Sequence, residues 1–204
     1  IQPSSSMTDA FHYINHIAIN PSGTRFMFFH LWTRDPDDPG EWSCRMFTAN
    51  IDGSGLHLLE DKGIPSHYAW RSDDILSVFV VEGRGKGQYY RYLDQQEKKE
   101  AMGDHLPNFD GHLSFSPEGS WMLTDSYPDR YFEQSLMLFS DDGDTRHLGR
   151  YRPEPPYFRD FRCDLHPRWD AHGESVIFDS AHQGGRAMYQ IVVTLPISKS
   201  NQPM

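Results

Sequence analysis

The stretch His112-Leu-Ser-Phe-Ser-Pro-Glu-Gly119, with the apolar run Trp121–Leu123 after it, decides the fold of this chain. The same order of a histidine, a short strand, a polar turn and an apolar run begins again at His16, His67 and His166. The four starts are 51, 45 and 54 residues apart. A repeat of this length, built from short strands and turns, is typical of a β-propeller, in which each repeat forms one four-stranded sheet.

We therefore expect an all-β chain, a β-propeller with about four blades. The last repeat lacks an obvious fourth strand, and the chain begins with Ile1 rather than methionine. Both features predict the C-terminal part of a larger, seven-bladed propeller, and a complete four-bladed ring is the alternative. We expect a loop or a short helix at Asp94–Ala101. The expected blades are 11–61, 64–103, 108–151 and 158–197, between a disordered or partial segment 1–10 and a tail 198–204.

Composition excludes some classes of partner. The net charge is −10, from 29 acidic and 19 basic residues, and there is no basic stripe of the kind that binds nucleic acid. No apolar run approaches the roughly 20 residues of a membrane helix. Cys44 and Cys163 could pair, remain free or bind a metal. The cytoplasm and the periplasm both remain open as locations, and nothing indicates an oligomeric state.

The four repeated histidines are expected to share one site. Equivalent positions of successive blades ring a common axis, so the histidines that start the four repeats should meet at one mouth of the central channel. Imidazole is the commonest metal ligand and the usual acid–base group near neutral pH. Four histidines at equivalent positions therefore indicate chemistry more than packing.

The segment Cys163-Asp164-Leu165-His166 is the densest group of possible metal ligands. On a strand, Asp164 and His166 would point the same way and Cys163 the opposite way. Joined by His112, they would form a nitrogen and oxygen site for Mn, Zn or Ca. Cys163 could ligate if the strand is bulged, which favours zinc. In the alternative, Asp164 caps a turn or pairs with Arg162 or Arg168.

Other candidate residues lie near strand ends. Arg45 starts an otherwise apolar strand, where an arginine needs a carboxylate from the protein or from a ligand. His30 ends a strand and could reach the mouth that His16 faces. Tyr68 and Tyr127 could act as phenolic acids.

The sequence contains no other catalytic signature: neither a Gly-x-Ser-x-Gly elbow nor a phosphate-binding glycine loop is present. The candidate substrate contacts are His16, Arg84 and Tyr127.

These segments resemble the oligogalacturonate lyases and the neighbouring ulvan lyases, with a wider similarity to TolB-like propeller repeats. The resemblance runs in collinear order over about residues 16–193. The matching segments are Phe29-His30, Arg45–Ser54, Ser66–Trp70, His112 with the Asp125 segment, His166–Trp169 and Val176–Ser180.

The resemblance implies a site. In the oligogalacturonate lyases a metal, usually manganese, is held by three histidines and a glutamine, and an arginine is the proposed base. By position Arg45 matches that base, and His67 matches a histidine beside it. His112 and His166 match two of the metal ligands. The other two ligand positions hold Asp164 and Phe161. The ulvan lyases use histidine and tyrosine instead, for which His16, His30 and Tyr68 are available.

The implied activity is a polysaccharide lyase reaction. A base removes the C5 proton of a uronic acid, the C4–oxygen bond breaks, and a divalent cation neutralises the adjacent carboxylate. The expected substrate is therefore an acidic oligosaccharide. Two other functions stay open: a non-catalytic TolB-like propeller that binds a protein or a sugar, and a hydrolase on the same scaffold.

Overall fold

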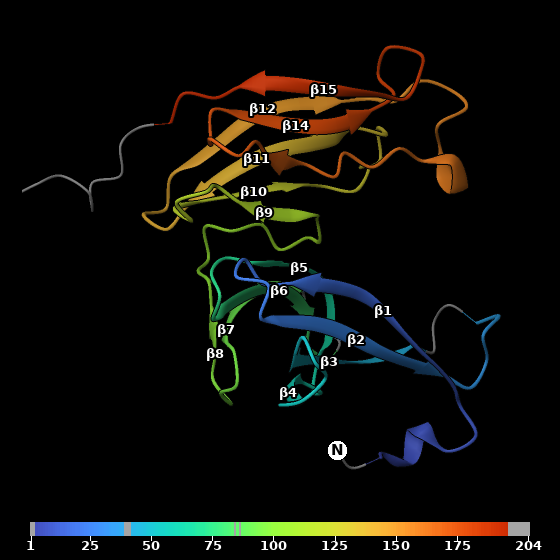
Figure 1. Ribbon diagram of the computed structural model, residues 1–204. Helices are drawn as coiled ribbons and strands as arrows, with labels where there is room; N and C mark the ends of the chain where they lie inside the picture. The colour runs from blue at the N-terminus through green and yellow to red at the C-terminus, as the bar shows by residue number, and fades with distance from the viewer. Residues whose placement is uncertain (1–2, 39–41, 84, 86, 196–204) are drawn as a thin grey trace, which may run out of the picture. The chain divides into compact units, whose positions relative to one another are not determined.

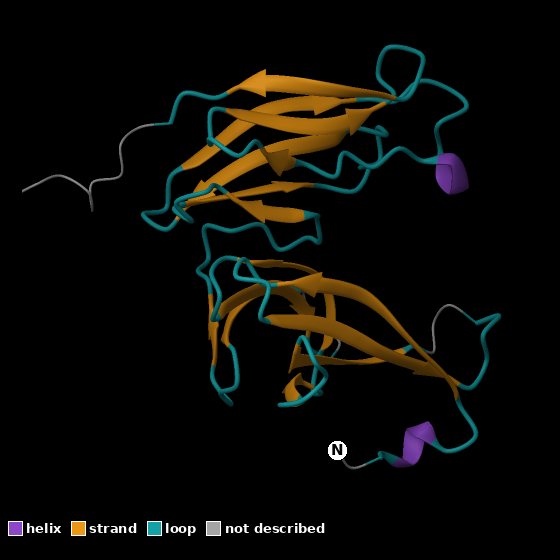
Figure 2. Cartoon of the chain, viewed as in Figure 1, coloured by secondary structure: helices purple, strands orange, loops and turns teal. Residues whose placement is uncertain are grey.

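The computed structural model describes residues 3–38, 42–83, 85 and 87–195, and its regular structure is almost entirely β-strand (Figure 2). Within each sheet, strands that are consecutive in sequence pair antiparallel, which gives simple meanders like those of propeller blades. This confirms the predicted all-β propeller fold class. The only helices among these residues are two single 3₁₀ turns, Ser5–Met7 and Arg159–Phe161. Within the same ranges, no helix is long and apolar enough to cross a membrane.

The chain forms two compact units, residues 1–104 and 105–204, and each holds two sheets (Figure 1). In the first unit, one sheet consists of β1 (Phe11–Ile19), β2 (Arg25–Thr33), β3 (Ser43–Asn50) and β4 (His57–Glu60). The other sheet consists of β5 (Ile64–Trp70), β6 (Ile75–Val81), β7 (Gln88–Leu93) and β8 (Lys99–Ala101). In the second unit, one sheet consists of β9 (Leu113–Phe115), β10 (Trp121–Asp125), β11 (Gln134–Ser140) and β12 (Thr145–Tyr151). The other consists of β13 (Arg168–Trp169), β14 (Ser175–Ser180) and β15 (Ala187–Val192). The predicted tail 198–204 lies outside the described residues.

The turn between the first and second strands is built alike in three of the sheets. Gly23, Gly119 and Gly173 have φ values of 72°, 74° and 72°, a left-handed conformation that favours glycine. A polar side chain three residues earlier accepts backbone N–H groups of the turn, such as those of Thr24 and Arg25 at Asn20 Oδ1. The repeated turn chemistry explains why the sequence repeat predicts the meander.

Each unit has its own hydrophobic core between its two sheets. In the first unit Met27 and Met46 pack with Val78, and in the second Leu123 and Leu138 pack with Val176 and Phe178. The side chains come from alternate strand positions, as expected when one face of each strand is buried. Burial of each such side chain contributes about 1.5–3 kcal/mol.

Two local predictions are wrong. Lys99–Ala101, within the segment predicted as a loop or a short helix, forms the edge strand β8, because pairing with β7 satisfies its backbone groups. Residues 163–166 are not a strand: β13 begins at Arg168, and His166 has a φ of 41°, which is incompatible with an extended chain. The alternation argument for Cys163, Asp164 and His166 therefore does not apply.

Candidate functional site

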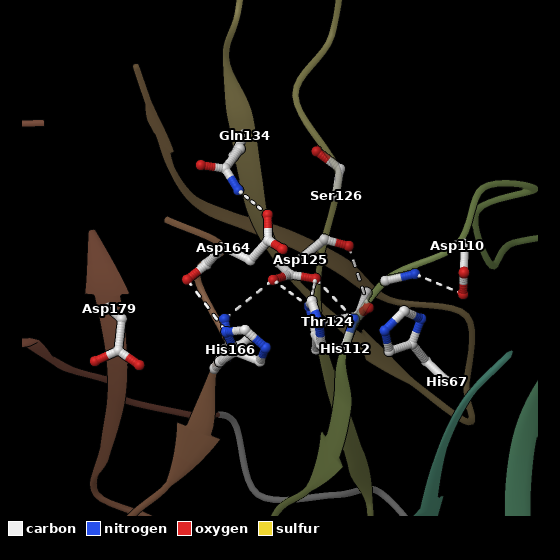
Figure 3. Close-up of polar contacts among 12 residues, drawn as sticks. His67, Asp110, His112, Thr124, Asp125, Ser126, Gln134, Asp164, His166 and Asp179 are labelled. Atoms are coloured by element: carbon white, nitrogen blue, oxygen red, sulfur yellow. Dashed lines mark hydrogen bonds and ion pairs between the residues drawn. The ribbon is translucent and has the colours of Figure 1, made fainter. Parts of the chain in front are cut away.

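A buried carboxylate, Asp125, organises a polar cluster in the second unit (Figure 3). Asp125 ends β10, and only 1% of its side chain is exposed. Its oxygens accept the backbone N–H of His112 at 2.7 Å, the backbone N–H of His166 at 3.2 Å, and Nδ1–H of the His112 ring at 2.9 Å. A buried carboxylate is stable only when its oxygens are hydrogen-bonded, so Asp125 holds both histidines in place.

The two imidazoles lie side by side, with ring centroids 3.9 Å apart. His112 immediately precedes β9, and His166 lies two residues before β13. Nδ1 of His166 is 3.3 Å from the carbonyl oxygen of Asp164, which can only accept, so Nδ1 carries the proton. In the neutral ring Nε2 of His166 is then the basic atom. Nδ1 of His112 donates to Asp125, which likewise directs Nε2 away from the anchor.

The acidic surroundings change the pKa of two groups in the cluster. Burial acts to lower the pKa of His112, but the hydrogen bond and charge of Asp125, with Asp164 and Asp110, outweigh burial and raise this pKa. Burial and the same acidic neighbours raise the pKa of Tyr127 to about 12. Its ring lies 5.9 Å from that of His112. Near neutral pH the phenol is therefore protonated, and the imidazolium form of His112 persists to higher pH than in a free imidazole.

Asp164 is held by an arginine. Its carboxylate accepts Nε–H and Nη2–H of Arg162, the latter at 3.0 Å, and the amide of Gln134 at 3.3 Å. This is the pairing that the sequence left open as an alternative. Cys163 and Cys44 are both buried free thiols, and burial raises the pKa of each. Across the part of the chain that the structure describes, no three His, Cys, Asp or Glu side chains form a group that could hold a metal ion.

A cavity of about 430 Å³ lies beside His166. Its lining includes Arg162, Asp164, His166, Asp179, Arg186 and Met188. Asp164 pairs with Arg162, and Asp179 lies 3.6 Å from Arg168. Arg186 donates Nη2–H to the carbonyl oxygens of Phe161, at 2.7 Å, and of Arg162, at 3.3 Å. The charge of Arg186 has no carboxylate partner among the described residues, so this guanidinium is available to an anionic group of a ligand.

The first unit contains a different arrangement, a chain of hydrogen bonds that begins at Arg45. Nη2–H of Arg45 donates to Nδ1 of His30 at 3.2 Å. His30 must then donate from Nε2 to Nδ1 of His12, at 2.9 Å, and His12 from Nε2 to the carbonyl oxygen of Met7, at 3.1 Å. Burial, and then the charges of Arg45 and His12, lower the pKa of His30. Burial also lowers the pKa of Arg45.

The remaining predicted residues of the first unit lie on β1 and β5. His16 sits within β1 at a bulge, with a φ of 54°, and its ring lies 6.0 Å from that of Tyr68. Burial raises the pKa of Tyr68. His67 occupies the corresponding bulge of β5, with Nδ1 3.2 Å from the hydroxyl oxygen of Ser66. Arg84 lies outside the described residues.

Three residues of these clusters were not singled out from the sequence. Asp125 was noted only as part of a matching segment, although an acid after the apolar run Trp121–Leu123 is a readable signal of a buried, partnered carboxylate. Arg186 and His12 give no such signal. Their roles depend on contacts with Phe161 and His30, which are 25 and 18 residues away in the sequence.

The comparisons with known proteins support the fold. No protein-family model and no curated protein matches the chain. A solved "oligogalacturonate lyase in complex with manganese" matches with a TM-score of 0.66 and 18% identity, over 89% of this chain and 49% of that one. TolB from Acinetobacter baumannii matches with a TM-score of 0.60 and 15% identity, over 92% of this chain and 40% of that one. The chain therefore spans about half or less of these proteins, and at such identities the likeness shows the β-propeller fold alone.

Proposed function

We propose that the chain acts as a polysaccharide lyase that cleaves uronate-containing oligosaccharides by β-elimination. One observation carries the proposal: His166, whose ring lies against that of His112, lines a cavity together with Arg162 and Arg186. Buried Asp125 accepts the ring Nδ1–H of His112 and the backbone N–H of His166, and so fixes the pair. The arrangement combines acid–base groups with donors for a carboxylate. The likeness to an oligogalacturonate lyase supports the substrate class.

The residues present do not fit the metal centre that the resemblance implies. His112 and His166 offer two imidazoles, but the Asp164 carboxylate is taken by Arg162 and Gln134. Protein metal centres of the expected kind need at least three protein ligands. The proposed reaction therefore has no step through a metal.

The reaction then uses the chain's own groups. The substrate carboxylate binds the guanidinium of Arg186, which stabilises negative charge as the C5 proton becomes acidic. Neutral His166 takes that proton at Nε2, the C4–oxygen bond breaks, and a C4–C5 double bond forms. His112, with its imidazolium form held by Asp125, gives a proton to the leaving oxygen. One proton is taken and one returned, so the protein ends with the same total charge.

The roles predicted for the first-unit candidates stay separate from this second-unit site. Arg45 donates a hydrogen bond to His30, a role for the protonated guanidinium. A guanidinium has a pKa above about 12, so we assign Arg45 to carboxylate binding rather than to proton removal. The catalytic roles of His67, His30 and Tyr68 stay predictions, as do the substrate contacts of His16, Arg84 and Tyr127.

Ultraviolet absorbance tests the activity, because new unsaturated sugar ends absorb and intact chains do not. We expect His166→Ala to lower the rate on oligogalacturonates at least about 100-fold, the scale of lost general-base catalysis. His172→Ala removes an exposed turn histidine of the same unit and should leave the rate unchanged. Wild-type rates in His166→Ala would contradict the proposal.

A non-catalytic TolB-like propeller is the second candidate, and the occupied carboxylate of Asp164 favours it. In that case the protein would bind uronate oligosaccharides, or a protein, without releasing unsaturated ends. Binding measured by calorimetry, with no rise in absorbance over hours at high protein concentration, would support this candidate against the lyase.

A further inference from the structure

A second cavity of about 260 Å³ in the second unit has aromatic walls. Its lining includes Tyr127, Phe132, Tyr157, Phe158 and two arginines, Arg159 and Arg162. The rings of Phe132 and Phe158 face each other with centroids 4.9 Å apart. The walls are thus apolar surfaces, with guanidinium groups on the lining.

The two cavities share a wall. Arg162 lines both, with its guanidinium carbon 4.8 Å from the centre of the Tyr127 ring and its N–H groups on Asp164. Arg186 lines the first cavity and lies 5.6 Å from the ring of Tyr157, which lines the second. Both arginines of the first cavity therefore rest on aromatic rings of the second. Such contacts orient a guanidinium without using its N–H donors.

Two residues of the aromatic cavity hold strained backbone conformations. Phe132 has a φ of 63° and Arg159 a φ of 52°, in the left-handed region that costs a bulky residue about 1 kcal/mol or more. Phe132 also leaves 47% of its surface exposed, and Tyr127 leaves 37%. Strain and exposed aromatic surface together are typical of a binding site, since neither helps the free protein.

We propose that the aromatic cavity of about 260 Å³ is a second sugar subsite. It would hold the sugar unit next to the uronate that binds in the cavity of about 430 Å³. This inference rests on the proposed function. The apolar C–H face of a sugar ring lies against an aromatic ring, and its hydroxyl or carboxylate oxygens accept N–H groups of Arg162 at the shared wall. The two cavities, of about 430 and 260 Å³, fall near the range of about 300–1,000 Å³ that is usual for ligand pockets.

Calorimetric titration with galacturonate monomer and trimer tests the subsite, with absorbance monitored so that cleavage during the titration is detected. Occupation of two linked subsites should make the trimer bind at least about ten-fold more tightly than the monomer. Phe132→Ala and Phe158→Ala should each weaken the trimer about ten-fold and leave the monomer unchanged, as truncation of an aromatic anchor does. Tyr131→Ala is the matched control, because Tyr131 is an exposed aromatic residue of the same loop that stacks on Arg130 instead.

The outcomes separate this inference from the function it rests on. Equal affinities for monomer and trimer, or variants that bind the trimer normally, would overturn the subsite while the lyase proposal stands. A wild-type protein that binds neither sugar would overturn both. Circular dichroism and the melting temperature show whether Phe158→Ala, at a half-buried position, still folds, and exposed Phe132→Ala keeps the test decisive if it does not.

Discussion

The two units use histidine in opposite ways, although the same sequence repeat builds both. In the first unit His30 accepts from the guanidinium of Arg45, and burial with that charge lowers its pKa. In the second unit His112 donates to the carboxylate of Asp125, and that charge raises its pKa in spite of burial. The repeat therefore fixes where imidazoles stand, while the charge of the neighbouring side chain decides which protonation state is favoured.

The contrast also concerns anchoring. His30 belongs to a series of hydrogen bonds that starts at Arg45 and ends on the backbone carbonyl oxygen of Met7. Because the Arg45 guanidinium can only donate, Nδ1 of His30 must accept and its Nε2 carries the proton. In the second unit, Asp125 accepts the ring N–H of His112 and the backbone N–H of His166. The two rings lie too close for both to be protonated at low cost. We therefore expect proton transfer at the second unit and charge-based binding at the first.

Asp125→Asn should have the largest effect and breaks the second half of the comparison. An amide removes the charge that favours the imidazolium of His112, so we expect cleavage to fall at least about 100-fold. The free energy of unfolding should fall by about 3 kcal/mol, because the amide removes the charge and replaces one of the two acceptor oxygens of the buried cluster by a donor NH2 group. Rate assays and urea unfolding measure the two effects. Asp142→Asn, in an exposed turn, is the control. Wild-type behaviour of Asp125→Asn would remove Asp125 from the argument.

Glu60 shows that the first unit also uses a buried carboxylate, but for stability. Burial acts to raise the pKa of Glu60, but hydrogen bonds from Lys99, Tyr92 and two backbone N–H groups lower it to about 2. A depressed pKa stabilises the fold above about pH 4.5, and this stability is lost as the pH falls toward 2. Glu60→Gln should cost about 2 kcal/mol at neutral pH and flatten the acid dependence. Urea unfolding between pH 2 and 7 checks this, and an unchanged slope would contradict it.

Arg45→Gln tests whether the charge of Arg45 helps to lower the pKa of His30 in the first unit, and its effect should be smaller than those above. We expect the pKa of His30 to rise part of the way to its ordinary value, because burial, the larger cause of its lowering, remains. The two histidines change the free energy of unfolding with pH in opposite directions. The lowered pKa of His30 stabilises the fold above its ordinary value of 6.5, and the raised pKa of His112 stabilises it below 6.5. NMR titration of the imidazole protons measures both, and equal pKa values for the two rings would end the contrast.

Metal addition or removal should have the smallest effect. If His112 and His166 work as an acid–base pair, EDTA should change the cleavage rate by less than about two-fold, since the site then lacks a full ligand set. One equivalent of Mn²⁺ should leave the imidazole NMR signals of both histidines sharp. Selective broadening of these two signals, or loss of activity in EDTA, would show a metal centre and break the assignment of His112 as a proton donor.

The sequence predicted the all-β propeller fold, but not which partners its polar side chains would meet. Regular polar turns, such as the one that ends at Gly119, and apolar runs such as Trp121–Leu123 mark strands by local chemistry, so the meanders were readable. The residues 163–166 predict a strand by their composition, but His166 adopts a left-handed backbone conformation that composition does not indicate. The role of Asp164 as a metal ligand stays a prediction: the sequence left a pairing with Arg162 open as the alternative, and only the fold shows that this pair forms.

The order of residues along the chain was enough to establish an all-β propeller, its blade repeat and the positions of its histidines, because strand alternation and turn formation depend on neighbours within a few residues. The partners of those histidines emerged only on folding. Asp125 reaches His166 across 41 residues, and Arg186 reaches Phe161 across 25. Hydrogen bonds and charge effects act over a few ångströms in space, and no local pattern encodes which distant side chains the packed sheets bring within that distance.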